Sequence, residues 1–199
     1  NNRSTGNVGG IGAGGLYAGN TLEMTGTQFI SNAAQIEGGG AYVAGAMSLN
    51  GGLFQNNTST TSGGGGLYAS STLALTGTQF ISNTASNVGG GAAVVGAVTA
   101  ANSRFENNRS TNSQGGGLFA QSTLWLTDTH FLSNTAFDLG GGALAVGAVT
   151  AENSRFQNNR STTLAGGGLF AQSNVWLTNT QFLSNTAGST GGGLSLFGD

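Results

Sequence analysis

The chain has 199 residues, enough for one domain with a sizeable core. Charge is sparse. Five arginines, no lysine and seven acidic residues give a net charge of −2, so the sequence shows no basic patch to neutralise nucleic-acid phosphates or to bind an anionic membrane surface. Cysteine is absent, which excludes a disulfide framework and a thiolate metal site. The 38 glycines suggest disorder, but apolar residues recur at fixed places and exclude it.

A four-residue pattern, Phe-x-x-Asn, organises the chain. Successive phenylalanines lie 25 or 26 residues apart in strict alternation. A fixed period of this size indicates one supersecondary unit repeated along an axis. The phenylalanines are Phe29, Phe54, Phe80, Phe105, Phe131, Phe156 and Phe182. The asparagines are Asn32, Asn57, Asn83, Asn108, Asn134, Asn159 and Asn185.

Two kinds of repeat alternate. The step from each Gly-Gly-Gly triplet to the next phenylalanine is constant, so the one-residue difference lies in the loop between the asparagine and the triplet. One triplet is followed by Leu, an aromatic residue and Ala, as in 64–69, and the other mostly by Ala, as in 89–92. The true period is therefore a 51-residue pair of repeats.

Within each repeat the local period is two. Leu118, Ala120 and Leu124 fall on one face, whereas Phe119 and Trp125 fall on the other. This alternation is typical of half-buried strands, and glycine clusters oppose a helix. Three short strands per repeat, joined by Gly- or Asn-rich bends, predict an all-β, right-handed parallel β-helix. We expect residues 1–199 to form one such domain of about eight coils, with 25–26 residues in each coil.

Stacked coils assign a structural role to the repeated residues. The phenylalanines should form an internal aromatic column and the asparagines an amide ladder between coils. Both can point inward only if the chain bends between them, so we expect a turn at Ser31, at Asn56 and at their equivalents. The glycine triplets should allow close approach of coils. A phosphate-binding loop would need a Lys and Ser/Thr or a helix to follow, and none follows.

The sequence starts and stops inside a repeat, which predicts a fragment or subunit of a longer or polymeric assembly. No apolar run approaches the roughly 20 residues of a transmembrane helix, and no signal peptide is visible. Uncovered strand edges would favour either further coils or end-to-end stacking into a filament. We expect partners to be other copies, neighbouring coils or surface glycans, with no nucleic acid and no membrane insertion.

The motif pair of Phe-x-x-Asn with Gly-Gly-Ala-x resembles the repeats of the polymorphic outer-membrane proteins of chlamydiae and of related bacterial surface proteins. The second motif stands here as 39–42, 90–93 and 141–144. The resemblance covers essentially the whole chain. It implies a secreted or surface-exposed β-helix, similar to an autotransporter passenger, at the bacterial cell surface or outside the cell. It also implies a structural or adhesin role, although no C-terminal translocator barrel is present in this sequence.

Outward positions carry the candidate interaction surface. An aromatic stripe lies beside the glycines, and two tryptophans fall two coils apart. Exposed aromatic rings suggest a protein contact or a carbohydrate-binding platform, and the alternative is packing against a loop or against a flanking segment outside this sequence. The stripe is Tyr17, Tyr42, Tyr68, Phe119 and Phe170, and the tryptophan pair is Trp125 and Trp176.

A Thr-x-Thr motif recurs in every second coil, as in Thr127-Asp128-Thr129. Such rows resemble ice-binding β-helices, but the interruption in alternate coils favours turn chemistry. Ice binding is thus less expected than the structural or carbohydrate-binding role.

Catalysis and cofactors are not indicated. The acidic residues do not align in adjacent coils, with Asp128 and Glu152 coming closest, and His130 is a solvated polar residue rather than a base. We expect no enzyme activity, no catalytic residues, no cofactor and no metal, since the Gly-Gly-x-Gly-x-Asp calcium repeat is absent.

Overall fold

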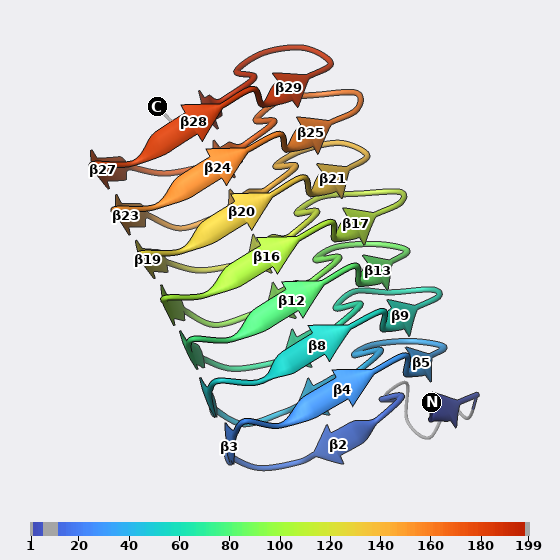
Figure 1. The fold of residues 1–199 in the computed structure, drawn as a ribbon. Coiled ribbons are helices and arrows are strands. Elements are labelled where there is room, and N and C mark those ends of the chain that lie inside the picture. Colours follow the sequence, from blue (N-terminus) through green and yellow to red (C-terminus); the bar gives the residue numbers. More distant parts are fainter. Residues whose placement is uncertain (1, 6–11, 198–199) are drawn as a thin grey trace.

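The chain forms a solenoid of stacked coils that rises steadily from the N-terminal to the C-terminal coil (Figure 1). The computed structural model describes residues 2–5 and 12–197. Every strand pair in this part of the chain is parallel, and each strand pairs with the equivalent strands of the coils before and after it. Four sheets result, which we number I to IV in the order in which a coil passes through them. Two sheets have seven strands and two have eight, so the solenoid makes about seven turns.

Sheet I follows the glycine triplets. In most of its strands the first and third side chains are buried in the core, and the middle one points away from it. Its strands are β2 (Leu16–Ala18), β6 (Ala41–Val43), β10 (Leu67–Ala69), β14 (Ala92–Val94), β18 (Leu118–Ala120), β22 (Ala143–Ala145), β26 (Leu169–Ala171) and β30 (Leu194–Leu196).

Sheet II has four-residue strands with strict alternation, in which the first and third side chains face the core. Its strands are β3 (Leu22–Thr25), β7 (Met47–Asn50), β11 (Leu73–Thr76), β15 (Val98–Ala101), β19 (Leu124–Thr127), β23 (Val149–Glu152) and β27 (Val175–Thr178).

Sheet III carries the phenylalanine at the centre of each strand, facing inward. Its strands are β4 (Gln28–Ile30), β8 (Leu53–Gln55), β12 (Gln79–Ile81), β16 (Arg104–Glu106), β20 (His130–Leu132), β24 (Arg155–Gln157) and β28 (Gln181–Leu183).

Sheet IV is the one that the sequence pattern does not reveal. The prediction of three strands per coil is wrong here, because a fourth strand of only two residues follows each asparagine, too short for an alternation to be recognised. Its strands are β1 (Arg3–Ser4), β5 (Ala33–Ala34), β9 (Thr58–Ser59), β13 (Thr84–Ala85), β17 (Arg109–Ser110), β21 (Thr135–Ala136), β25 (Arg160–Ser161) and β29 (Thr186–Ala187).

The predicted phenylalanine column is confirmed. All seven rings stack along the solenoid axis with centroids 4.8 to 5.0 Å apart, and neighbouring rings are nearly parallel. Phe80, Phe105 and Phe131 are fully buried. The column packs against the inward Leu, Val and Ala side chains of sheets I and II in one continuous core. Offset stacking of this kind adds to the burial of apolar area.

The predicted asparagine ladder is also confirmed, and it is more complete than expected. The Asn83 Nδ2 donates to Asn108 Oδ1 at 3.0 Å and to the backbone carbonyl of Phe54 at 2.8 Å. Its Oδ1 accepts from the backbone N–H and from the Nδ2 of Asn57, both at 3.0 Å. Each ladder amide from Asn57 to Asn159 therefore makes four hydrogen bonds, which satisfies a buried Asn side chain completely. The ladder extends back to Asn2, which donates to Asn32.

The predicted bend between phenylalanine and asparagine is present in every coil. Ser31 and Asn56 have φ values of 57° and 54°, and the equivalent residues are similar. A left-handed residue turns the chain, so that the Phe and the Asn three positions later both face inward.

The glycine triplets have the predicted structural role. The first glycine has a positive φ, as at Gly89 with 66°. At Gly90 an added Cβ would lie 2.5 Å from the backbone of Arg109 and would meet the carbonyl oxygen of Gly116. The coils therefore approach each other too closely for any side chain at this position.

Candidate functional site

The aromatic stripe lies where the sequence predicts, on the outer side of sheet I. Its members occupy one register column, in which Tyr17, Tyr42 and Tyr68 stack with centroids 5.4 and 5.5 Å apart. The column continues through Ala93, Phe119, Leu144, Phe170 and Ser195.

Exposure of the whole stripe, however, is a wrong prediction. Tyr42 and Phe170 are each only 5% exposed, and Tyr68 and Phe119 are half-buried. Only Tyr17 remains open to solvent, at 55%. Most of the stripe is therefore a second, smaller core and not a free surface.

The loops between sheet IV and sheet I cover the stripe. Leu139 and Ala165, which directly precede glycine triplets, pack with Phe119, Leu144 and Phe170 in a separate apolar cluster. Serines of sheet IV hold these loops in place by donating to loop carbonyls, as Ser110 Oγ does to Asn87 and Ser161 Oγ to Asp138. Packing against a loop, the alternative considered above, is thus what the structure shows.

Polar groups within this covered layer are desolvated. The Tyr42 hydroxyl lies 2.8 Å from the Ser70 hydroxyl. Burial raises the pKa of the Glu37 carboxyl, and a hydrogen bond from Ser62 partly opposes the shift. Burial, together with the nearby Glu37 and Tyr42, also raises the pKa of Tyr68. These shifts result from loop packing, so they do not identify a reactive group.

The tryptophan pair is the part of the predicted surface that is exposed. Trp125 and Trp176 lie in one outward column of sheet II and are 45% and 56% exposed. Thr150 separates them, and Thr99 precedes them in the column. Two strand spacings place the indole rings about 10 Å apart along the axis. The neighbouring outward column holds Thr127, Glu152 and Thr178 beside the indoles, so the surface around the indoles is polar.

The Thr-x-Thr motif does not present two threonines to solvent. Thr127 is exposed, but Thr129 is fully buried and its hydroxyl donates to the carbonyl of Ala100 at 3.0 Å. The residue between them, Asp128, has a φ of 48° and forms the corner between sheets II and III. The second threonine therefore belongs to the corner, as expected from turn chemistry, and a two-threonine row is not formed.

The acidic residues and His130 do not converge. Among the described residues no three His, Asp or Glu side chains come close enough to hold a metal ion. Asp128 and His130 line a shallow hollow at the corner of sheets II and III together with Arg104, but Glu152 lies outside this lining. No helix in the described part of the chain is long and apolar enough to cross a membrane.

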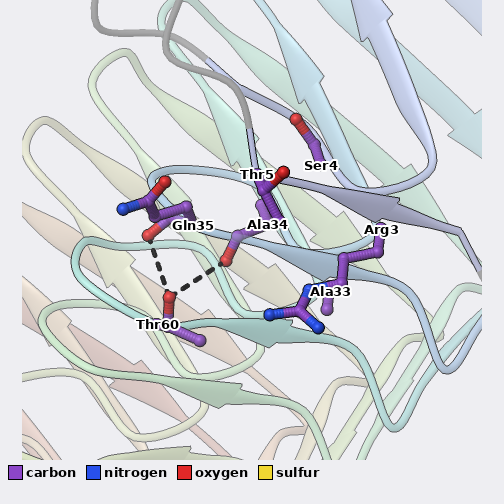
Figure 2. Close-up of a pocket in the computed structure, with 7 residues that line it drawn as sticks. All are labelled: Arg3, Ser4, Thr5, Ala33, Ala34, Gln35 and Thr60. Carbon is purple, nitrogen blue, oxygen red and sulfur yellow. Dashed lines mark hydrogen bonds between the residues drawn. The ribbon is translucent and has the colours of Figure 1, made fainter.

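A second hollow lies beside β1 and β5 (Figure 2). Its lining presents one guanidinium, three hydroxyls and two alanine side chains, and the Thr60 hydroxyl donates to the backbone carbonyls of Gln35 at 3.2 Å and Ala34 at 3.5 Å. These lining residues include no pair of side chains that could act as a nucleophile and its general base. The lining residues are Arg3, Ser4, Thr5, Ala33, Ala34, Gln35 and Thr60.

The gathering of four arginines on two adjacent sheets is what the sequence reasoning missed. These arginines do not form a run in the sequence, yet the fold places them in two outward columns on adjacent sheets. Arg104 and Arg155 share one column of sheet III with His130, and Arg109 and Arg160 share one column of sheet IV. The signal was their spacing, since 104 to 155 and 109 to 160 each equal the 51-residue period.

A family model described as a right-handed β-helix region matches residues 9–198. Neither the search of curated proteins nor that of solved structures finds a match. The family match therefore covers nearly the whole chain and supports the fold described above.

Proposed function

Because this chain belongs to the family of right-handed β-helix regions, we propose that it is an extracellular structural and adhesive module. In this proposal the interior builds a stiff rod and the outward residues meet the partner. The observation that carries it is the contrast between inside and outside. The phenylalanine column and the asparagine ladder keep the same residue from coil to coil, whereas an outward column of sheet II changes from Ala74 to Thr99 to Trp125.

A rod of this kind would hold binding residues at fixed spacings. Each coil is joined to the next by strand pairing in four sheets and by the ladder amides, so bending the rod requires breaking hydrogen bonds. An adhesive surface benefits because rigid presentation lowers the entropy lost on binding. The resemblance to polymorphic outer-membrane proteins is consistent with such a role and stays part of the proposal, as do the surface location and the autotransporter-like context.

Self-assembly end to end is a second element of the proposal. Successive coils already stack in one register with parallel strands, and a coil of another copy could use the same register. Electron microscopy and sedimentation of the purified chain test this element. Filaments, or a sedimenting mass that rises with concentration, would support end-to-end assembly. Monomers at all concentrations would contradict it.

A carbohydrate-binding module is the alternative, and the tryptophan pair favours it. Two exposed indoles about 10 Å apart on a polar surface suit stacking against the sugar rings of an extended glycan. The Trp125→Ser/Trp176→Ser double variant should then lose glycan binding, whereas Thr150→Ser, between the indoles, should retain it.

The adhesive proposal is tested by coating beads with the folded chain and measuring retention on extracellular-matrix proteins and on a glycan array. Specific retention that the tryptophan double variant abolishes would support adhesion through sheet II. Retention no higher than that of beads carrying an unrelated folded protein, on every surface, would overturn the adhesive role. Circular dichroism of each variant checks that the solenoid is intact.

A further inference from the structure

Four arginines and one histidine gather on one side of the solenoid, across the outer surfaces of sheets III and IV. We name this set, Arg104, Arg109, His130, Arg155 and Arg160, the arginine face. These residues come from three consecutive coils: β16 and β17 from the first, β20 from the second, and β24 and β25 from the third. Figure 1 shows β16, β20 and β24 one above another, with β17, β21 and β25 beside them.

The register of the sheets fixes the geometry of the arginine face. Arg104 pairs with His130, which pairs with Arg155, and the second column runs from Arg109 through Thr135 to Arg160. Two strand spacings separate the members of each arginine pair, or about 10 Å along the axis. The four arginine positions therefore mark the corners of an array with two sides parallel to the rod axis.

Two carboxylates, those of Glu106 and Asp128, offset part of the charge of the arginine face. Glu106 forms an ion pair with Arg104 at 2.6 Å, and this is the single ion pair among the described residues. Arg109, His130 and Arg160 are exposed, and the buried Nε of Arg155 has no hydrogen-bond partner within the described ranges. Asp128 lines the same hollow as Arg104 and His130 at the corner of sheets II and III. The remaining described carboxylates lie on sheet II or in the covering loops, at Glu23, Glu152, Glu37 and Asp138.

The side of the solenoid that bears the arginine face is thus positive, although the chain as a whole carries a net charge of −2. A locally positive surface attracts an anionic partner even when the net charge is negative, because fields act over about one Debye length. Guanidinium groups bind carboxylates and sulfates through paired N–H donors, which makes arginine suited to this task.

We propose that the arginine face binds a linear acidic polysaccharide lying along the rod axis. An extended sugar chain advances by roughly one coil spacing per ring, so acidic groups on every second sugar would meet successive arginine pairs. Gln157 and Thr135, which face outward within the array, offer partners for sugar hydroxyls. The outward positions of strands β16, β20 and β24 hold no Phe, Tyr or Trp, and His130 is the one aromatic ring there, so nucleic-acid bases would find no row of stacking side chains.

This inference deepens the adhesive role by naming a partner class, and in that respect it rests on the proposed function. The arginine face lies on sheets III and IV, whereas the tryptophan pair lies on sheet II, so substitutions can alter either surface separately. If arginine variants lose binding to acidic polysaccharides but keep their retention through Trp125 and Trp176, the result bears on the arginine face alone.

The test is a binding titration of the purified chain with a heparin-derived octasaccharide, an oligogalacturonate and a neutral dextran oligomer. We expect both acidic ligands to bind, with affinity that falls as salt rises, and the neutral ligand not to bind. Arg109→Gln/Arg160→Gln and Arg104→Gln/Arg155→Gln should each weaken binding by about tenfold or more, the loss expected for charge-assisted hydrogen bonds. Arg109→Lys/Arg160→Lys should keep part of the affinity.

Arg3→Gln is the matched control, because Arg3 lies in the column of Arg109 but four coils away. Equal loss in Arg3→Gln and in the double variants would overturn the proposal, as would equal binding of dextran. Tighter binding of single-stranded DNA or of anionic vesicles would also overturn it in favour of those partners. Thermal unfolding of every variant, compared with the native chain, separates lost contacts from lost folding.

Discussion

A single asparagine side chain fixes the register of each coil. The amide has two N–H donors and two acceptor lone pairs, and in the interior of the ladder all four are used, as at Asn83. A one-residue slip would leave these groups buried without partners, which is costly. The residue before each asparagine supplies the left-handed bend, so register and chain direction are set within two residues.

Replacing Asn108 by Ala should therefore destabilise the solenoid strongly. The variant leaves the backbone N–H of Asn83 and one N–H of its side-chain amide buried without an acceptor. At about 1–3 kcal/mol for each such group, plus a cavity, we expect a loss of about 3–5 kcal/mol in the free energy of unfolding. Urea unfolding followed by circular dichroism measures it.

Asn87→Ala is the control, because the Asn87 side chain is exposed on a covering loop. This change should stay within about 0.5 kcal/mol of the native chain. Equal losses in the two variants would mean that the ladder contributes no more than an ordinary surface amide.

The sequence predicts the ladder and the bend well, because both repeat in every coil with few residue types. It does not predict that each amide also donates to a phenylalanine carbonyl of the neighbouring coil, as Asn57 does to Phe29. That bond depends on how far the chain turns at the bend, and a pattern of residue types carries no such distance.

At the scale of one coil, the glycine triplet sets how closely two coils approach. Its first position needs a left-handed backbone, and its second has no room for a Cβ, as at Gly89 and Gly90. The corner between sheets II and III is different. Gly77 also has a positive φ, of 60°, but an added Cβ would have open space, and the equivalent position in other coils is Asn102, Asp128 or Asn153.

Gly90→Ala should consequently unfold or severely weaken the solenoid, whereas Gly77→Asn should be tolerated. The alanine methyl would overlap the backbones of Arg109 and Gly116, and relief requires the coils to separate. We expect a loss above about 3 kcal/mol for Gly90→Ala and less than about 1 kcal/mol for Gly77→Asn. Thermal melts of both variants give the comparison, and similar melting temperatures would show that coil spacing can adapt.

The coil also shows where sequence reasoning stops. Alternation identifies which side chains leave the core, but it does not say what lies over them. The alternation therefore predicts that Tyr42 and Phe170 are exposed. Both are in fact buried, and Phe170 packs with side chains of the covering loops. Trp125 and Trp176 have the same alternation and remain exposed, which the alternation alone does not distinguish from the covered positions. The two-residue strands of sheet IV were missed because they are shorter than one period of the pattern.

At the scale of the whole molecule, the solenoid is a one-dimensional array in which each coil contacts only its neighbours. The period of the sequence shows which residues occupy equivalent positions in successive coils, so the columns of stacked side chains could be predicted. The arginine face was not recognised, because its members are dispersed in the sequence and gather only when the columns are read across two sheets.

Double-mutant cycles on the phenylalanine column test this array. Phe105→Leu and Phe131→Leu alter stacked neighbours 4.8 Å apart and should show a coupling of about 0.5–1.5 kcal/mol. Phe54→Leu and Phe156→Leu lie four coils apart, or roughly 19 Å, and their effects should add within about 0.5 kcal/mol. Unfolding free energies of the single and double variants supply the cycle. Strong coupling of the distant pair would contradict the nearest-neighbour description.

The asparagine ladder also has a direction. Every ladder amide points its oxygen toward the preceding coil and donates to the oxygen of the following one, as Asn57, Asn83 and Asn108 do in turn. The amide dipoles are therefore parallel along the axis. Two copies that met by like ends would oppose oxygen to oxygen or N–H to N–H. Any axial joining through this ladder is consequently head to tail, a contact that does not close on itself and gives polar fibres rather than symmetric dimers.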